Sequence, residues 1–127
     1  MKGAAGVPGK TLWAIAEGYI PGGSTGEGRA LESHEAVCIL NAGAHDAHVR
    51  IMIYFSDREP AGPYTVTVPA RRTLHLRFND LKDPEPVPRD TDYSSVIASD
   101  QPVVLQHTRL DSRQSALALL STLAYSE

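Results

Sequence analysis

The stretch Val49-Arg50-Ile51-Met52-Ile53-Tyr54-Phe55 decides the fold class of this chain. Its apolar and more polar side chains alternate at every second position. A period of two places neighbouring side chains on opposite faces of a β-strand, whereas a helix needs a period of about 3.6. The stretch therefore predicts an antiparallel strand with one buried face.

The same alternation, or a short apolar run, marks further strand candidates. They are residues 12–16, 35–40, 65–68, 73–79, 93–98, 103–110 and 117–125. The last is rich in Ala and Leu, which also favour helix, and strand is the preferred interpretation. Turn residues separate the candidates, as in Asn41-Ala42-Gly43. Short strands at regular spacing predict an all-β sandwich or barrel.

Composition limits the classes of protein to consider. The chain has 127 residues, 42% of them hydrophobic, and its 12 Lys and Arg against 15 Asp and Glu give a net charge of −3. This size suits one globular domain, here residues 11–127. The acidic balance argues against a dedicated nucleic-acid binder, and the longest apolar run, residues 36–40, falls far short of the ~20 residues that cross a bilayer.

The N-terminus and the cysteine content predict the compartment. Residues 1–10 contain no continuous hydrophobic region and are interpreted as a flexible leader rather than a secretory signal. Cys38 is the only cysteine and has no partner within the chain for a disulfide. Its position inside an apolar run predicts an inert thiol. A reducing cytoplasm is therefore expected.

Two strand candidates are apolar on both faces. Residues 36–40 and 117–124 lack the polar outer side that a solvated sandwich strand shows. A second layer, such as another subunit, is expected to cover them.

The most polar candidate site follows the apolar strand that starts at Val103. Strand parity places His107, Arg109 and Asp111 on the same face as Val103, so this face changes from apolar to charged along its length. Such a cluster can line a pocket at the end of a core. The alternative is a simple ion pair, Arg109 with Asp111 or Asp111 with Arg113, at the edge of the sheet.

Trp13 and Glu17 share a face by the same parity. An indole ring beside a carboxylate is a common floor for polyols, and the alternative places Trp13 at the centre of the core. His45 and His48 have a spacing that can supply two metal ligands, but surface histidines are the preferred interpretation. No nucleophile elbow, phosphate loop or dinucleotide fingerprint occurs in the sequence.

Five longer motifs resemble one known family, that of the sensory rhodopsin transducers. The motifs are WAIAEGYIP at 13–21, SHEAVCILNAG at 33–43, VPARRT at 68–73, RFNDL at 77–81 and QHTRLDSRQ at 106–114. They occur in the family's order and cover nearly the whole chain. The leader and residues 22–31 do not match the family pattern.

The resemblance implies a fold and a role. It implies a single-domain antiparallel β-sandwich of about eight strands, jelly-roll or carbohydrate-binding-module-like, that assembles as a cytoplasmic homotetramer. The implied role is signal transduction from a microbial rhodopsin or another membrane receptor, or from a small polar ligand such as a sugar. No catalysis, cofactor or metal is implied.

The expected ligand-binding residues combine the resemblance with the patterns above. Trp13 would stack on the ligand, Glu17 and Asp111 would accept hydroxyl protons, and Asn79, His107 and Arg109 would donate hydrogen bonds or bind an anion.

An enzyme is one alternative of a different class. It would act on a sugar and use His107 with Asp111 or Glu17 as an acid–base pair, which requires both groups to face one cavity.

A DNA-binding regulator is the other alternative. It would use Arg50, Arg71, Arg72 and Arg77 on the exposed face of one sheet. Repetition of that patch in an oligomer would build a basic surface that the net charge of one chain hides.

Overall fold

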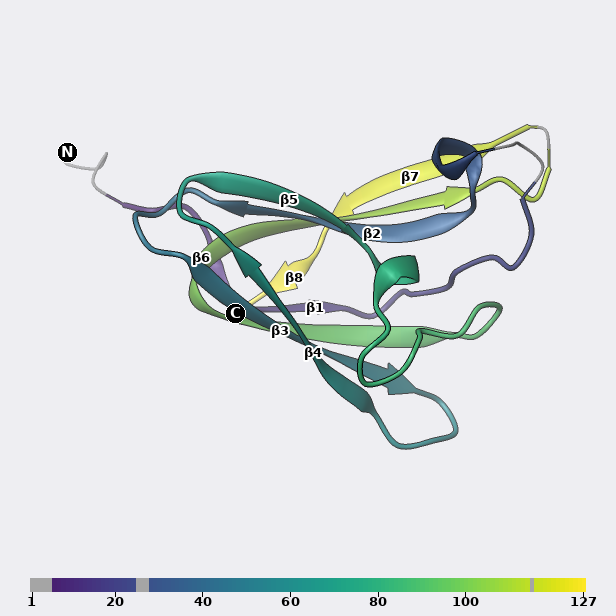
Figure 1. Cartoon of the computed structure of the whole chain (residues 1–127), viewed down its shortest axis with the longest axis horizontal. Coiled ribbons are helices and arrows are strands. Elements are labelled where there is room, and N and C mark those ends of the chain that lie inside the picture. Colours follow the sequence, from purple (N-terminus) through teal and green to yellow (C-terminus); the bar gives the residue numbers. More distant parts are fainter. Residues whose placement is uncertain (1–5, 25–27, 115) are drawn as a thin grey trace.

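The structure, a computed structural model, describes residues 6–24, 28–114 and 116–127. It is a β-sandwich of two antiparallel layers (Figure 1), which confirms the predicted all-β fold. Residues 1–5 of the expected leader and residues 25–27 of the glycine-rich loop lie outside the described residues. Within the described part, no helix has the length and apolar character that crossing a membrane requires.

Eight strands and two short 3-10 turns make up the described secondary structure. The strands are β1 (Lys10–Ile15), β2 (His34–Asn41), β3 (Ala47–Phe55), β4 (Ala61–Val68), β5 (Arg72–Arg77), β6 (Tyr93–Asp111), β7 (Ala118–Leu123) and β8 (Tyr125–Ser126). The 3-10 turns are η2 (Arg29–Leu31) and η3 (Phe78–Asp80). The C-terminal segment is strand, as predicted, although it is divided into β7 and β8.

Strand β6 belongs to both layers. Its first half, residues 93–99, lies between β1 and β3. Its second half, residues 104–111, lies between β2 and β7. The layers are therefore β4-β3-β6-β1-β8 and β5-β2-β6-β7, and β6 bends back so that both of its ends lie at the same end of the molecule (Figure 1).

The prediction of two separate strands at 93–98 and 103–110 was wrong, because β6 is one strand of 19 residues. Pro102 lies between the two predicted strands, and proline cannot donate to a ladder. The pairing with β3 ends at Ser99 and the pairing with β2 begins at Val104. Pro102 therefore lies at the bend between the two ladders. Neither ladder needs a backbone N–H group at this position.

The core fills the space between the two layers. Its centre contains aliphatic side chains with no exposed surface, among them Val37, Ile39, Ile51, Ile97 and Leu105. The alternating positions of β3 are buried as expected, since Val49, Ile51 and Ile53 point inward while their neighbours point out. Burial of such a side chain contributes roughly 1.5–3 kcal/mol.

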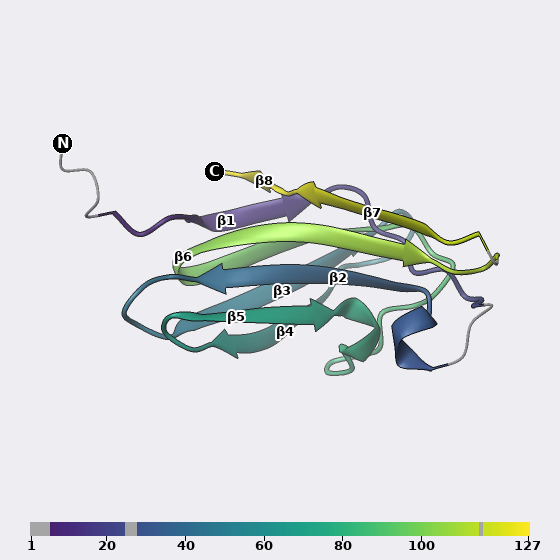
Figure 2. The same cartoon turned by 90° about the horizontal axis from the view of Figure 1, so that it is seen from above.

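Strand β7 is an edge strand with an apolar surface. It pairs only with β6 among the described residues, and all six of its residues are exposed. Leu119 is 69% exposed and Leu123 is 63% exposed. Their partners on β6, Leu110 and Gln106, alternate with the inward-facing positions, so both leucines project from the outer face of the layer. Figure 2 shows β7 running along the outside of β6.

Candidate functional site

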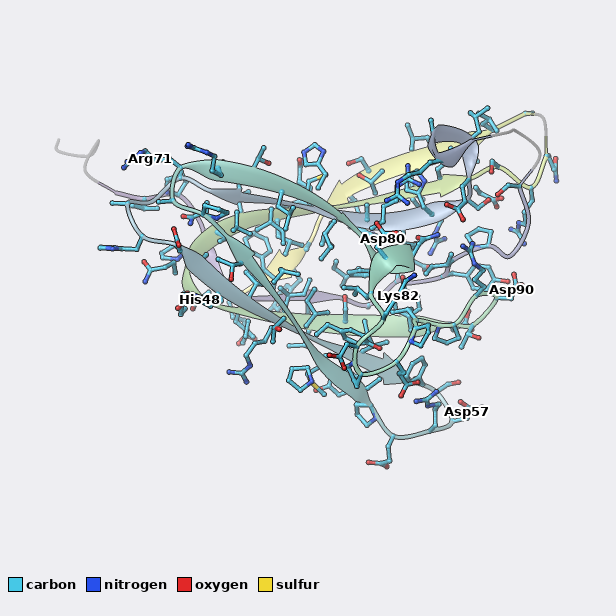
Figure 3. All side chains as sticks on the ribbon, viewed as in Figure 1. His48, Asp57, Arg71, Asp80, Lys82 and Asp90 are labelled. Atoms are coloured by element: carbon cyan, nitrogen blue, oxygen red, sulfur yellow. The ribbon has the colours of Figure 1, made fainter. Side chains whose placement is uncertain are left out.

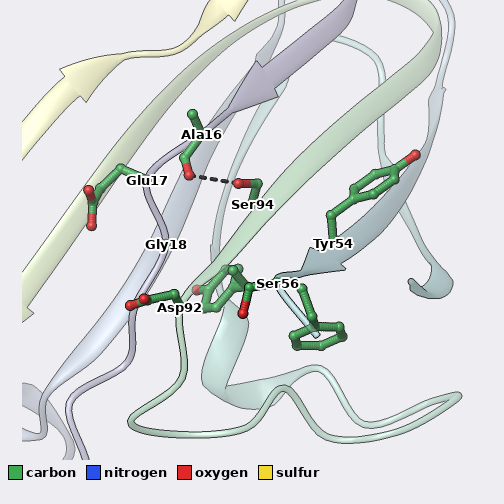
Figure 4. A pocket seen from close by; sticks show the side chains of 9 residues that line it. Ala16, Glu17, Gly18, Tyr54, Ser56, Asp92 and Ser94 are labelled. Carbon is green, nitrogen blue, oxygen red and sulfur yellow. Dashed lines mark hydrogen bonds between the residues drawn. The ribbon is translucent and has the colours of Figure 1, made fainter. Parts of the chain in front are cut away.

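A cavity of about 390 Å³ opens at the end of the first layer. Three segments form it: the loop after β1, the end of β3 and the start of β6. Its lining residues are Ala16, Glu17, Gly18, Tyr54, Phe55, Ser56, Asp92, Tyr93 and Ser94 (Figure 4). The volume falls within the range of small-molecule sites in proteins.

The loop after β1 is held against β6 by backbone contacts. The Ser94 hydroxyl donates to the Ala16 carbonyl at 2.7 Å, and the Tyr93 amide donates to the Gly18 carbonyl at 3.0 Å. A Cβ atom on Gly18 would lie 2.5 Å from the Tyr93 ring, so only glycine allows this close approach. These contacts fix Glu17 at the wall of the cavity.

A buried polar cluster lies behind the cavity, with Glu35 of β2 at its centre. The Glu35 carboxylate has no exposed surface. It accepts hydrogen bonds from the Tyr93 hydroxyl at 2.9 Å and from Arg109 Nε at 2.5 Å. Tyr93 stands at the start of β6 and Arg109 near its end, so one carboxylate ties together both ends of the bent strand.

Arg109 connects this cluster to the cavity. Its Nη2 group donates to Glu17 Oε2 at 2.8 Å, while its Nε group binds Glu35. The Glu17 side chain is 69% exposed and the Arg109 side chain 17%. The guanidinium therefore bridges a buried carboxylate and an exposed one.

His107 completes the cluster without a hydrogen bond of good geometry. Its Nε2 atom is buried and lies 3.2 Å from Glu35 Oε1, but it makes no hydrogen bond within the described part of the chain. Charge attraction across this distance requires a protonated imidazole. The His107–Glu35 pair is therefore a close contact and not a hydrogen bond.

Burial and charge shift the pKa values of two members. Burial, together with the adjacent Glu35 charge and hydrogen bond, raises the pKa of Tyr93 far above its usual value. Burial alone would lower the pKa of Arg109, but its hydrogen bonds to Glu17 and Glu35 outweigh that effect and raise it. The phenol therefore stays neutral and the guanidinium stays charged at physiological pH.

Asn79 supports the cluster from the side. Its Oδ1 atom accepts the Glu35 backbone amide at 3.2 Å and its Nδ2 atom donates to the Ser33 carbonyl at 3.0 Å. Both groups of the amide are thus bonded to the start of β2. The structure places Asn79 as a brace between η3 and β2.

Trp13 and Asp111 lie apart from this cluster. The Trp13 side chain is in the core, 4% exposed, with its Nε1 group donating to the Lys10 and Val103 carbonyls at 3.1 Å each. Its ring is therefore covered, and the structure gives the core position instead of a stacking floor. Asp111 binds its neighbour Arg113 at 2.7 Å, which is the ion pair weighed as an alternative.

The catalytic alternative paired His107 with Asp111 or Glu17. The structure instead brings His107 to Glu35, and both side chains are buried, at 1% and 0% exposure. Neither His107 nor Glu35 lines the cavity. An acid–base pair has to reach its substrate, and these two buried side chains do not face the cavity.

The arginine patch expected for DNA binding is divided between the two layers. Arg50 belongs to β3 in the first layer, whereas Arg72 and Arg77 belong to β5 in the second. Arg77 also donates to the Arg29 carbonyl at 2.8 Å and is largely covered. Arg71 occupies the β4–β5 turn at one end of the molecule (Figure 3). The single basic face that was predicted is therefore not formed.

One of the two histidines considered as metal ligands, His48, has another side-chain partner. His48 Nδ1 lies 2.8 Å from Asp100, and Asp46 accepts the Ala70 amide at 3.0 Å. Within the described part of the chain, no group of three or more His, Cys, Asp or Glu side chains is placed to hold a metal ion.

Sequence reasoning missed Glu35, Tyr93 and Asp92. The signal for Glu35 was present, since a period of two places it on the buried face of β2 with Val37 and Ile39. A carboxylate at such a position requires a cation or several hydrogen-bond donors. Arg109 and Tyr93 supply these, yet only the bend of β6 brings them together.

Comparisons with known proteins agree with this fold. Residues 8–126 match the family described as Anabaena sensory rhodopsin transducer. A solved structure named Anabaena sensory rhodopsin transducer is 62% identical, with a TM-score of 0.68, over 78% of this chain and 95% of that one. A second, a crystal structure of Thermotoga maritima 1070, is 36% identical, with a TM-score of 0.84, over 94% and 96%. The comparison with curated proteins gives no match.

The family match spans nearly the whole described domain, including every residue of the cavity and of the buried cluster. The chain therefore belongs to the Anabaena sensory rhodopsin transducer family.

Proposed function

We propose that this protein is a cytoplasmic, non-catalytic transducer that relays occupancy of the cavity by a small polar ligand, or contact with a membrane receptor, to its strand β7. The observation that carries the proposal is the position of Glu17. This carboxylate stands on the cavity wall and is bonded to Arg109, whose second bond reaches the buried Glu35.

The relay follows from the competition for Glu17. A ligand that binds the Glu17 carboxylate weakens its bond to Arg109, because both compete for the same oxygens. Arg109 pairs directly with Leu120 of β7 in the ladder. A change in the position of Arg109 therefore displaces its neighbour on β7, which lies about one strand spacing away.

Strand β7 also supplies a surface for assembly, which we propose is a homotetramer. Its backbone edge is free within the described part of the chain, and Leu119 and Leu123 project into solvent. Free edges with exposed apolar side chains pair with other chains. Leu40 of β2, 42% exposed, extends the apolar surface on the same layer.

The partner follows from the family. The relative of known structure is named a transducer of a sensory rhodopsin. We propose that the present chain likewise couples to a microbial rhodopsin or to another membrane receptor.

The relay is tested by titrating the protein with a panel of sugars, small acids and small amines. Trp13 fluorescence and the amide chemical shifts of the cavity and of β7 report the response. We expect at least one compound to shift both sets of amides in the wild-type protein. In Arg109→Lys, which keeps the charge but loses the fork that bridges two carboxylates, the cavity amides still respond and the β7 amides do not.

Either of two results contradicts the proposal. The first is a compound that shifts the cavity amides and leaves the β7 amides unchanged in the wild-type protein. The second is a panel in which no compound gives any response. Glu59→Gln serves as the control, because it removes one exposed carboxylate outside the cavity lining.

A further inference from the structure

The charges around the cavity have one sign. Its ionisable acids are Glu17 and Asp92, and its lining includes no Lys, Arg or His. Figure 4 shows these two carboxylates projecting on the same side of Gly18, with Tyr54 on the other side. A lining of this kind attracts positively charged molecules and repels anions.

Arg109 does not cancel this charge. Its guanidinium is shared between Glu17 and the buried Glu35, so this group of three keeps one negative charge. Asp92 adds a second, and it has no ion pair within the described part of the chain. An unpaired carboxylate at a cavity mouth is available to a ligand.

The remaining wall is aromatic. Tyr54, Phe55 and Tyr93 all line the cavity. Outside the cavity lining, the Arg58 guanidinium lies 4.4 Å from the centre of the Phe55 ring. Aromatic faces attract ammonium and guanidinium groups through their quadrupole. The aromatic lining is independent of the carboxylates and favours the same class of ligand.

We propose that the cavity binds an organic cation, namely a small alkylammonium or alkylguanidinium compound. The cationic head would bind the Glu17 and Asp92 carboxylates, and the alkyl chain would pack toward Tyr54 and Phe55. The inference rests on the proposed function and specifies its ligand. It also accounts for the relay, because the bound cation replaces Arg109 as the partner of the Glu17 carboxylate.

The experiment is calorimetric titration of the whole protein with agmatine and cadaverine, and with glucose and succinate as neutral and anionic probes. Agmatine or cadaverine binds, more weakly as salt increases, and glucose and succinate do not. Asp92→Asn weakens that binding by about twofold to fivefold, the loss typical of one charge pair at an accessible site. Asp92 is exposed, so the variant is expected to fold.

Asp100→Asn is the matched control. It removes the same charge from β6, the strand that follows Asp92, but Asp100 is bonded to His48 and lies outside the cavity lining. Figure 3 shows His48 toward the end of the sandwich opposite Asp90, away from the cavity. Binding of the amine by Asp100→Asn is expected to equal that of the wild-type protein.

Three outcomes overturn the inference. If glucose or succinate binds and the amines do not, the ligand class is wrong, whereas the cavity remains a sensing site and the proposed function stands. If Asp92→Asn and Asp100→Asn weaken amine binding equally, the cation binds by net charge alone. If none of the four probes binds at millimolar concentration, the cation inference fails, and the wider panel decides the proposed function.

Discussion

The two halves of β6 differ in what surrounds them. The first half lies between β1 and β3, and its inward residues Ser95 and Ile97 are at most 1% exposed. The second half lies between β2 and β7, and every residue of β7 is exposed. The inward side of both halves is buried, but only the second half has a fully exposed edge strand as a neighbour.

The difference shows where the chain completes its own packing and where it does not. The buried side of the first half, formed by Tyr93, Ser95 and Ile97, carries no charged side chain. The second half supplies His107 and Arg109 to the charged cluster around Glu35 of β2, and it lies next to an edge strand with apolar outer residues. We infer that the first half provides the stability of the domain and the second half its contacts with other molecules.

Removal of Glu35 gives the largest expected effect. Glu35→Ala leaves Arg109 partly buried with one carboxylate instead of two, and it removes the acceptor of the Tyr93 hydroxyl. Breaking a buried ion pair from one side costs about 3–5 kcal/mol of unfolding free energy. Urea denaturation measures this loss. A loss below about 1 kcal/mol would mean that the cluster is solvated like a surface pair.

Core truncations compare the two halves directly. Ile97→Ala removes a fully buried side chain and should cost about 2–5 kcal/mol of unfolding free energy. Leu119→Ala removes an exposed one, and at dilutions where the chain is monomeric it should cost less than about 0.5 kcal/mol. Equal losses in the two variants would show that β7 is buried within a single chain.

The Tyr93 hydroxyl gives an intermediate and pH-dependent effect. Because the pKa of Tyr93 is raised in the folded state, its contribution is complete below the unfolded value of about 10 and is lost as the pH rises above it. Tyr93→Phe should cost about 1–3 kcal/mol at neutral pH, through the Glu35 oxygen left without its donor. It should also flatten the fall of stability between about pH 10 and pH 11, measured by denaturation at each pH. An unchanged alkaline slope would contradict the buried phenol.

The Asp111–Arg113 pair gives the smallest effect. Hydrogen bonds from Arg113 lower the pKa of Asp111, so the pair stabilises the fold above about pH 4 and this stabilisation is lost as the pH falls through the lowered pKa. Both side chains are partly exposed. Arg113→Ala should therefore leave the thermal unfolding temperature at pH 7 almost unchanged, while a large drop would place this turn inside an interface.

The positions of the strands could be predicted from the sequence, but the bend that carries β6 from one layer into the other could not. The alternation in β3 predicted which residues are buried, because successive side chains of a strand point to opposite faces of the sheet. The bend of β6 was missed, because only the pairing of its two halves with their neighbours shows that one strand continues through Pro102 without losing a ladder bond. Without that bend, Tyr93 and Arg109 are not expected to meet.

The candidate site was predicted in part for the same reason. His107, Arg109 and Glu17 were chosen from strand parity and do share one cluster. Trp13 was chosen because an indole ring can stack on a ligand. The structure instead buries this large apolar ring in the core, where it fills volume. Asp92 precedes β6 in a loop, where no periodicity indicates which way a side chain points.

The central claim is that the chain leaves its β7 side open and that further copies of the chain cover it. Light scattering of the purified protein, combined with amide hydrogen exchange, tests this most directly. We predict a mass four times that of the 13.7 kDa chain with protected β7 amides, and a folded monomer with unprotected β7 amides in the Leu119→Asp, Leu123→Asp double variant. A wild-type protein that is monomeric at high concentration, with β7 amides that exchange freely, would contradict the claim.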